Sequence, residues 1–226
     1  MSKFLLFLQY FDRNEVMKLK DLGNIPFTVS ILDSIFPDNS VIVAKAKRLE
    51  ESGDLIRLKK GLYVVSPNIT EKPLNEFLIA NHLYGPSYVS MQSALRYYGL
   101  IPERVYEITS ITTGLRKEFK NKIAFFSYIH CPKEYYSIGI KIIPEGSHQF
   151  LMASPEKALC DMMVYSPNLN LRYKSEIRSY LEKDIRFNLD AFKYFNVDIL
   201  RECEEKGKKK RMISQLIKFI ENGRYL

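Results

Sequence analysis

Cysteine is scarce in this 226-residue chain, and its three cysteines, Cys131, Cys160 and Cys203, lie far apart. Because their number is odd and no CxxC pair occurs, the sequence predicts neither a disulfide framework nor a zinc site. The three histidines are isolated too, so they predict no metal site. We expect the cysteines to be small buried hydrophobic residues in a reducing cytoplasm.

Long apolar runs are absent, and no stretch of 18 apolar residues is present that would span a membrane. The first apolar run, residues 4–11, is short and contains Gln9. It leads into Asp12 and Arg13 without a small-residue cleavage site, which argues against a secretory signal. We therefore expect a cytoplasmic protein that does not bind membranes.

Glycine and proline are also few, with ten of each, whereas hydrophobic residues make up 46% of the chain. This composition can bury a core and excludes a disordered or fibrous protein.

Sequence signatures of enzymes are missing as well. The chain contains no GxxxxGK[ST], GxGxxG, HExxH or GxSxG motif. Glu156 and Asp161 are five residues apart, off a common helix face, whereas Lys157 and Asp161 have the spacing of an ordinary helix-surface ion pair. The sequence thus predicts no catalytic residues, no cofactor and no metal.

Basic residues outnumber acidic ones by 34 to 26, which gives a formal net charge of +8. The surplus is concentrated in residues 207–226, with six basic and one acidic residue, and in clusters at residues 45–48 and 57–60. A surplus of this size suggests a polyanionic partner.

A break in the pattern is expected near residues 66–73, where proline and polar residues separate two apolar stretches. Before the break, Thr28 is the expected N-cap of a helix that runs through Phe36. Asp38, Asn39 or Ser40 is the expected N-cap of a second helix, which runs to about Ser52. Residues 55–58 and 62–65 flank a Lys-Lys-Gly turn, as in a β-hairpin.

After the break, the pattern mixes helices and strands. Helices are expected at residues 74–84 and 90–98, and another is expected to start at Ser154-Pro155. Strands are expected at residues 105–113, 123–129, 137–143 and 148–152, and residues 173–226 are expected to be helical. We therefore predict an α+β chain with an N-terminal winged helix-turn-helix at 1–67, a mixed α/β domain at 74–170 and a helical extension at 171–226.

The order helix, helix, hairpin in residues 27–65 is the arrangement that places one helix in the DNA major groove and a wing on the backbone. In the helix at 38–52, Ile42, Ala46 and Leu49 share the face expected to be buried. The candidate DNA contacts are small or basic residues on the opposite face and at the wing tip: Ser40, Ala44, Lys45 on a flank, Lys47, Arg48, Lys59 and Lys60. The alternative is a solvated amphipathic helix beside a charged hairpin.

A second basic cluster, Lys208, Lys209, Lys210 and Arg211, precedes an amphipathic stretch near the C-terminus. It is either an accessory contact to DNA or to an acidic partner, or the solvated first turn of a packed terminal helix.

Several segments together resemble the AbiEi-type antitoxins, the AbiEi-like transcriptional regulators of type IV toxin–antitoxin systems. The matching segments, in the order of the family, are LIRLKKGLYVVSP (55–67), FLIANHLYGPSYVSMQSALRYYGLIPE (77–103), ITSITTG (108–114), FSYIH (126–130) and ASPEKALCDMM (153–163). They cover about half of the chain.

The resemblance implies a winged helix that binds double-stranded operator DNA and represses its own operon. It also implies an antitoxin-like domain that opposes a nucleotidyltransferase-like toxin in phage defence. By matching position, it assigns DNA contact to the helix at 38–52 and to Lys59, Lys60 and Tyr63.

Two rivals stay open at this point: a protein-interaction module that neutralises a toxin directly with a vestigial DNA-binding domain, and an enzyme that acts on nucleic acid. The sequence also leaves open whether a toxin is encoded nearby and whether the chain forms a homodimer.

Overall fold

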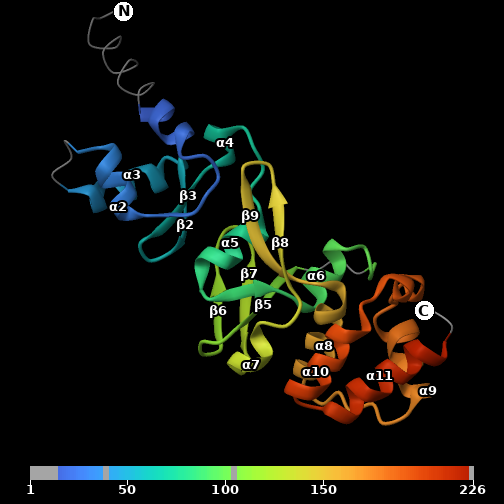
Figure 1. The fold of residues 1–226 in the computed structure, drawn as a ribbon. Coiled ribbons are helices and arrows are strands. Elements are labelled where there is room, and N and C mark those ends of the chain that lie inside the picture. Colours follow the sequence, from blue (N-terminus) through green and yellow to red (C-terminus); the bar gives the residue numbers. More distant parts are fainter. Residues whose placement is uncertain (1–14, 38–40, 103–105, 224–226) are drawn as a thin grey trace, which may run out of the picture. The chain divides into compact units, whose positions relative to one another are not determined.

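The computed structural model describes residues 15–37, 41–102 and 106–223. It is a mixed α+β structure with two β-sheets (Figure 1). Packing divides the chain into two units: the first runs through Leu83 and includes residues 120–123, and the second comprises Tyr84–Phe119 and Ala124–Leu226. We describe each unit by itself.

The first unit consists of short helices and a small sheet. Residues 15–21 are helical. The elements that follow are β1 (Phe27–Thr28), α2 (Val29–Ile35), α3 (Ile42–Glu51), β2 (Leu55–Lys59), β3 (Leu62–Val65), α4 (Pro67–Thr70) and α5 (Glu76–Leu83). The helices and the hairpin predicted for this region are therefore formed, and β1 is an addition.

Local sequence explains the ends of α2 and α3 only in part. The N-cap of α3 is Val41, which makes no side-chain cap, so the prediction of Asp38, Asn39 or Ser40 as N-cap is wrong. Thr28 occupies the N-cap of α2 as predicted, but its hydroxyl bonds the Ser30 Oγ at 2.6 Å and caps no backbone N–H. After α3, Gly53 takes φ +83°, a left-handed conformation that glycine adopts without strain. Gly61, with φ +76°, does the same in the turn between β2 and β3.

The sheet of the first unit has the order β1-β3-β2, and both pairings are antiparallel. Its core joins side chains from the N-terminal helix, α2, α3 and the sheet: Leu19, Phe27, Leu32, Phe36, Ala46, Leu49, Leu55, Tyr63 and Val65. Burial of these apolar side chains holds α3 against the hairpin.

The linker predicted at residues 66–73 is wrong, because this segment is structured and belongs to the first unit. The Ser66 hydroxyl accepts the backbone N–H of Asn68 at 3.3 Å and caps α4. The side-chain amide of Asn24 donates to the carbonyls of Lys72 and Pro73 at 3.0 and 2.7 Å. The division between the units follows Leu83 instead, after α5.

The second unit holds the larger sheet and most of the helices. Its elements are β4 (Ser87–Val89), α6 (Met91–Tyr97), β5 (Glu107–Thr112), β6 (Lys117–Lys120), β7 (Phe125–His130), α7 (Lys133–Tyr136), β8 (Ile140–Glu145), β9 (His148–Ala153), α8 (Pro155–Tyr165), α9 (Lys174–Ser179), a π-helical turn (Tyr180–Asp184), a 3₁₀ helix (Leu189–Tyr194), α10 (Val197–Lys206) and α11 (Lys210–Asn222).

Six strands form this sheet in the order β6-β7-β5-β4-β9-β8. β5 pairs with β7, and β4 with β9, in parallel, whereas β4–β5 and β8–β9 are antiparallel. The four strands predicted here are present, whereas β4 and β6 were not expected. β4 has only three residues, and β6 has four with a single apolar side chain, so neither shows a clear alternation.

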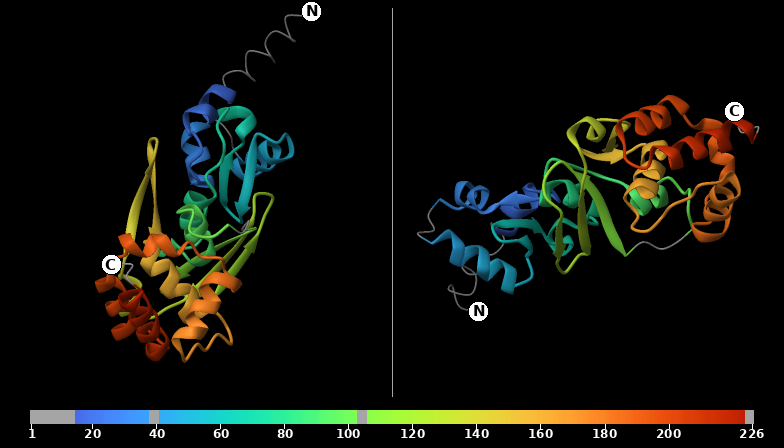
Figure 2. Two further views of the ribbon diagram at one scale, coloured as in Figure 1. Left: turned by 90° about the vertical axis from the view of Figure 1, so that its right-hand side faces the viewer. Right: turned by 90° about the horizontal axis from the view of Figure 1, so that it is seen from below.

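Helices pack on this sheet and on one another. α6 contacts β5 and β9, α8 contacts α6 and β9, and α10 and α11 pack with α8 (Figure 2). The helical character predicted after residue 171 is confirmed for the part of it that the structure describes. Among residues 15–37, 41–102 and 106–223, no helix is both long and apolar enough to cross a lipid bilayer.

Candidate nucleic-acid interface

The buried and exposed faces of α3 match the predicted pattern. Ala46 and Leu49 are buried, and Ile42 is partly buried against the same core. Ala44, Lys47 and Arg48 are exposed, as the helical period requires. α3 therefore presents an outward face to solvent, although Ser40, the first predicted contact, lies outside the described residues.

Lys45 does not belong to that outward face, and its assignment as an exposed contact is wrong. The residue is 5% exposed, and its ammonium is ion-paired with the carboxylate of Glu15. The ammonium also lies 4.8 Å from the centre of the Phe36 ring, at cation–π distance. Because the N-terminal helix and α2 cover it, Lys45 anchors α3 instead of facing a ligand.

The two outward cations of α3 each face a carboxylate. Arg48 Nη2 lies 3.1 Å from Glu15 Oε2, and Lys47 Nζ lies 3.6 Å from Glu51 Oε1. The Lys47–Glu51 pair is exposed on both sides, so it contributes little stability and exchanges readily for another anion. Arg48 is exposed too, but its partner Glu15 is 15% exposed and also binds Lys45.

The two lysines predicted at the hairpin tip differ in their surroundings. The ammonium of Lys59, at the end of β2, donates a hydrogen bond to the carbonyl of Leu83 at the end of α5. Lys59 is therefore only half-exposed, and it is held within the unit. Lys60, in the turn itself, is exposed. The expected pair of phosphate-facing lysines is reduced to Lys60.

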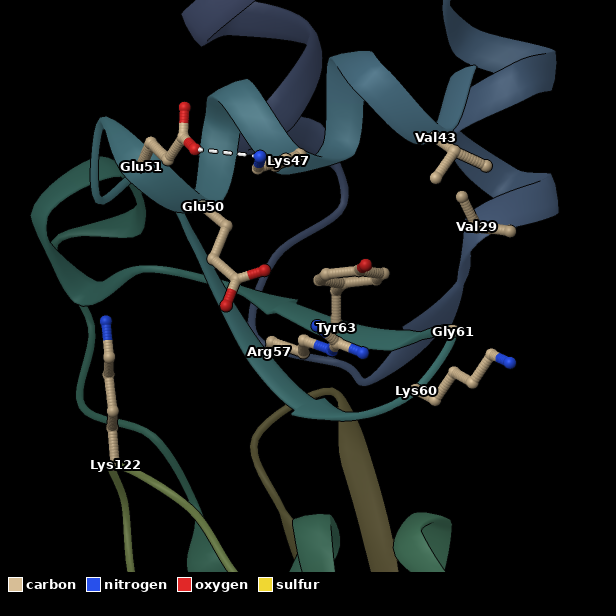
Figure 3. Close-up of a pocket in the computed structure, with 10 residues that line it drawn as sticks. All are labelled: Val29, Val43, Lys47, Glu50, Glu51, Arg57, Lys60, Gly61, Tyr63 and Lys122. Atoms are coloured by element: carbon tan, nitrogen blue, oxygen red, sulfur yellow. Dashed lines mark ion pairs between the residues drawn. The ribbon is translucent and has the colours of Figure 1, made fainter. Parts of the chain in front are cut away.

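A groove with a volume of about 650 Å³ lies between α3 and the hairpin (Figure 3). Its lining residues come from α2, α3, the hairpin and the segment 120–123: Val29, Val43, Lys47, Glu50, Glu51, Arg57, Lys60, Gly61, Tyr63 and Lys122. Figure 3 shows the ring of Tyr63 between the helix and the strands, with Val29 and Val43 at the same end of the groove. The groove brings Lys47, Lys60 and Tyr63 together from the predicted set. Tyr63, however, is only 7% exposed and belongs to the core of the first unit, so its assignment as an exposed DNA contact is wrong.

Seven of the lining residues were missing from the predicted contacts, and three of them matter for ligand binding: Arg57, Val43 and Lys122. Arg57 is exposed on β2, but burial does not alternate along this strand and its register shifts between Arg57 and Lys59, so strand periodicity does not identify Arg57. Val43 is 66% exposed, but an apolar residue carries no signal of its own in a basic helix. Lys122 lies more than 60 residues further along, and the amide of neighbouring Asn121 bonds the Leu58 carbonyl at 3.3 Å. No local pattern places Lys122 at this groove.

The basic cluster near the C-terminus is split. The ammonium of Lys209 donates to the carbonyls of Met163, Ser166 and Leu169 at 3.2, 2.9 and 2.9 Å. Desolvation lowers the pKa of Lys209, and its side chain binds the C-terminal end of α8. All four residues of the cluster are exposed. Because the ammonium of Lys209 is bound to these carbonyls, the accessory patch retains Lys208, Lys210 and Arg211.

The ion pair predicted on the surface of α8 lies in the core of the second unit, so that prediction is wrong. Lys157 and Asp161 are both 0% exposed, and Lys157 Nζ lies 3.0 Å from Asp161 Oδ1. The other carboxylate oxygen accepts the hydroxyls of Tyr88 at 3.1 Å and Ser90 at 2.6 Å. The ammonium also donates to the carbonyl of Tyr135 at 3.1 Å.

This buried cluster joins β4 to α8 through charged hydrogen bonds. Burial raises the pKa of Tyr88 well above its ordinary value, and the charge of Asp161 raises it further. Since both charged side chains are fully covered, the cluster is a structural element of the second unit and offers no access to a substrate.

The cysteines of the described chain are all free and buried. In the same described ranges, no three His, Cys, Asp or Glu side chains are grouped closely enough to hold a metal ion.

Neither the known protein families nor the curated protein sequences contain a match to this chain. Function is therefore inferred from the residues and from the geometry of the groove.

Proposed function

We propose that the first unit is a winged helix-turn-helix and that the chain is a sequence-specific DNA-binding repressor. In this proposal α2 and α3 form the helix-turn-helix, α3 enters the major groove, and β2–β3 is the wing. The observation that carries the proposal is the exposed face of α3 beside a hairpin tipped by Lys60, with Lys47, Arg57 and Lys122 around one groove.

Exposed cations of the first unit are available to phosphates. Lys60 is exposed at a turn, and Lys47 makes a solvent-exposed ion pair that a phosphate can replace. Arg48 is itself an exposed cation, although its partner Glu15 is largely covered. Each such contact to DNA releases counterions and gives affinity that falls with salt. The net charge of +8 favours the same partner.

The resemblance to AbiEi-type antitoxins supports a narrower form of the proposal. In that form the chain represses the operon that encodes it, and its second unit opposes a nucleotidyltransferase-like toxin.

An electrophoretic shift assay tests the proposal with the DNA immediately upstream of the chain's own coding sequence. We expect a shift at lower protein concentration than with random DNA of the same length at moderate salt. Lys47→Ala and Arg48→Ala are each expected to weaken binding by about 1–3 kcal/mol where a base is read. Lys193→Ala in the second unit, which also removes one exposed and paired lysine, is the control. Equal binding of both DNAs would overturn the proposal.

A direct toxin neutraliser is the second candidate, and the acidic residues around α3 favour it. Glu15, Glu50 and Glu51 offset the positive charge of Lys47 and Arg48. For this candidate, the expected result is stable co-purification with the product of a neighbouring gene, together with no preference for upstream DNA.

A further inference from the structure

The start of α3 exposes apolar side chains where the proposed DNA-binding face begins. Val41 is 59% exposed and Val43 is 66% exposed, and Ala44 is exposed beside them. Val43 also lines the groove, together with Val29 of α2 (Figure 3). An isolated exposed valine needs no explanation. Here, however, Val29 and Val43 share one end of a groove whose remaining walls are mostly charged, and Val41 and Ala44 are exposed next to Val43 in the chain.

The described residues of α3 offer few side chains that read bases by hydrogen bonding. Residues 42–51 contain no Asn, Gln, Ser or Thr, so α3 has no amide for adenine. Lys45 is buried, and Lys47 and Arg48 lie one turn or more beyond Val43 beside carboxylates. In a helix-turn-helix, the N-terminal residues of the second helix contact the base edges. In α3, those residues are apolar.

We infer that Val43, with Ala44, contacts the 5-methyl group of thymine in the major groove. This inference rests on the proposed function and names the sequence class it reads: an operator with thymine opposite the start of α3. The thymine methyl is the apolar group that the bases present in the major groove. Contact between it and a valine methyl removes apolar surface from water, whereas the surrounding cations attract any sequence equally.

The test replaces thymine by deoxyuridine, which keeps the pairing edge and the charge but lacks the methyl group. Duplexes of the upstream DNA carry this replacement at one position at a time, within the region that the bound protein protects from nuclease digestion. Replacement at one or two positions is expected to weaken binding of the full chain about fourfold, the value of one buried methyl or methylene group. The other positions are expected to bind unchanged.

Protein variants connect the effect to the residue. Val43→Ala is expected to bind the thymine duplex about fourfold more weakly and to lose most of its response to deoxyuridine at the same position. The substitution is compatible with folding, because the side chain is exposed and alanine favours a helix. Ile142→Ala is the matched control, since Ile142 is a β-branched side chain that is 61% exposed in the second unit.

The outcomes separate this inference from the proposal beneath it. Specific binding that is unaffected by deoxyuridine at every position would overturn thymine reading and leave the repressor proposal standing. An effect of deoxyuridine that persists unchanged in Val43→Ala would also overturn the assignment to Val43. Absence of specific binding to the thymine duplex would overturn both.

Discussion

Replacing Asp161 by Asn tests how strongly the buried ion pair holds the second unit together. Asn keeps a carbonyl oxygen for the hydroxyls of Tyr88 and Ser90, which lie 3.1 and 2.6 Å from Asp161 Oδ2. It removes the negative charge beside Lys157, whose ammonium is 3.0 Å away and 0% exposed. An unpaired buried ammonium remains, and we expect the free energy of unfolding to fall by about 3–5 kcal/mol.

Lys157→Met is expected to lower the free energy of unfolding by about as much as Asp161→Asn, because it leaves the carboxylate of Asp161 buried without its cation. The double variant Lys157→Met/Asp161→Asn removes both charges together. Its remaining defects are an unpaired amide group and the carbonyl of Tyr135, which loses its donor. We expect the double variant to lower the free energy of unfolding by about 1–3 kcal/mol, well below the sum of the effects of the two single variants.

Urea unfolding followed by circular dichroism measures these values. Glu182→Gln is the matched control, because Glu182 forms an i,i+4 pair with Arg178 at 3.5 Å that is exposed to solvent. That control is expected to change stability by less than about 0.5 kcal/mol. If Asp161→Asn resembles the control, or if the single effects add in the double variant, the reasoning about a buried pair is refuted.

Three further predictions follow from the surroundings of single residues. Burial raises the pKa of the Cys131 thiol from 9.0 to about 12, so the folded state keeps a proton that the unfolded state releases. The free energy of unfolding should therefore fall as pH rises from 9 to 12, and less steeply in Cys131→Ala; equal slopes in pH-dependent urea unfolding would contradict this. Lys209→Ala should lower the free energy of unfolding by about 1–2 kcal/mol, because three carbonyls lose their donor, whereas Lys208→Ala should not. Equal melting temperatures of the two variants would contradict a stabilising role of these hydrogen bonds. Lys60→Ala should reduce the slope of log affinity for DNA against log salt concentration by about one, whereas Lys59→Ala should leave this slope unchanged. A smaller slope in Lys59→Ala but not in Lys60→Ala would show that Lys59 leaves the Leu83 carbonyl to bind DNA.

Local chemistry in the sequence determined most helices and strands. Ser154 and Pro155 predict the start of α8, and the Ser154 hydroxyl indeed accepts the backbone N–H of Lys157 at 3.3 Å. The spacing of Ile42, Ala46 and Leu49 predicts which face of α3 is buried. Such features depend on neighbours within one or two turns of chain, so a single sequence is enough to reveal them.

The boundary between the two units could not be predicted from the sequence. Ser66-Pro67 and Lys72-Pro73 have the composition of a linker, but Asn24 binds the carbonyls of Lys72 and Pro73 from more than 40 residues away. The same residue types occur in a linker and in a loop that is hydrogen-bonded to a distant residue, because proline and serine limit only local backbone angles. The partner that distinguishes the two lies elsewhere in the chain.

The tertiary structure alone decided which charged side chains face solvent. Lys45, Lys59 and Lys157 appear in the sequence as ordinary basic residues, yet their ammonium groups bind Glu15, the Leu83 carbonyl and Asp161. A lysine has a long apolar stem and a charged end, so helix or strand periodicity does not establish whether that end reaches water or a partner. The answer depends on which distant element covers the residue, and that is a property of packing.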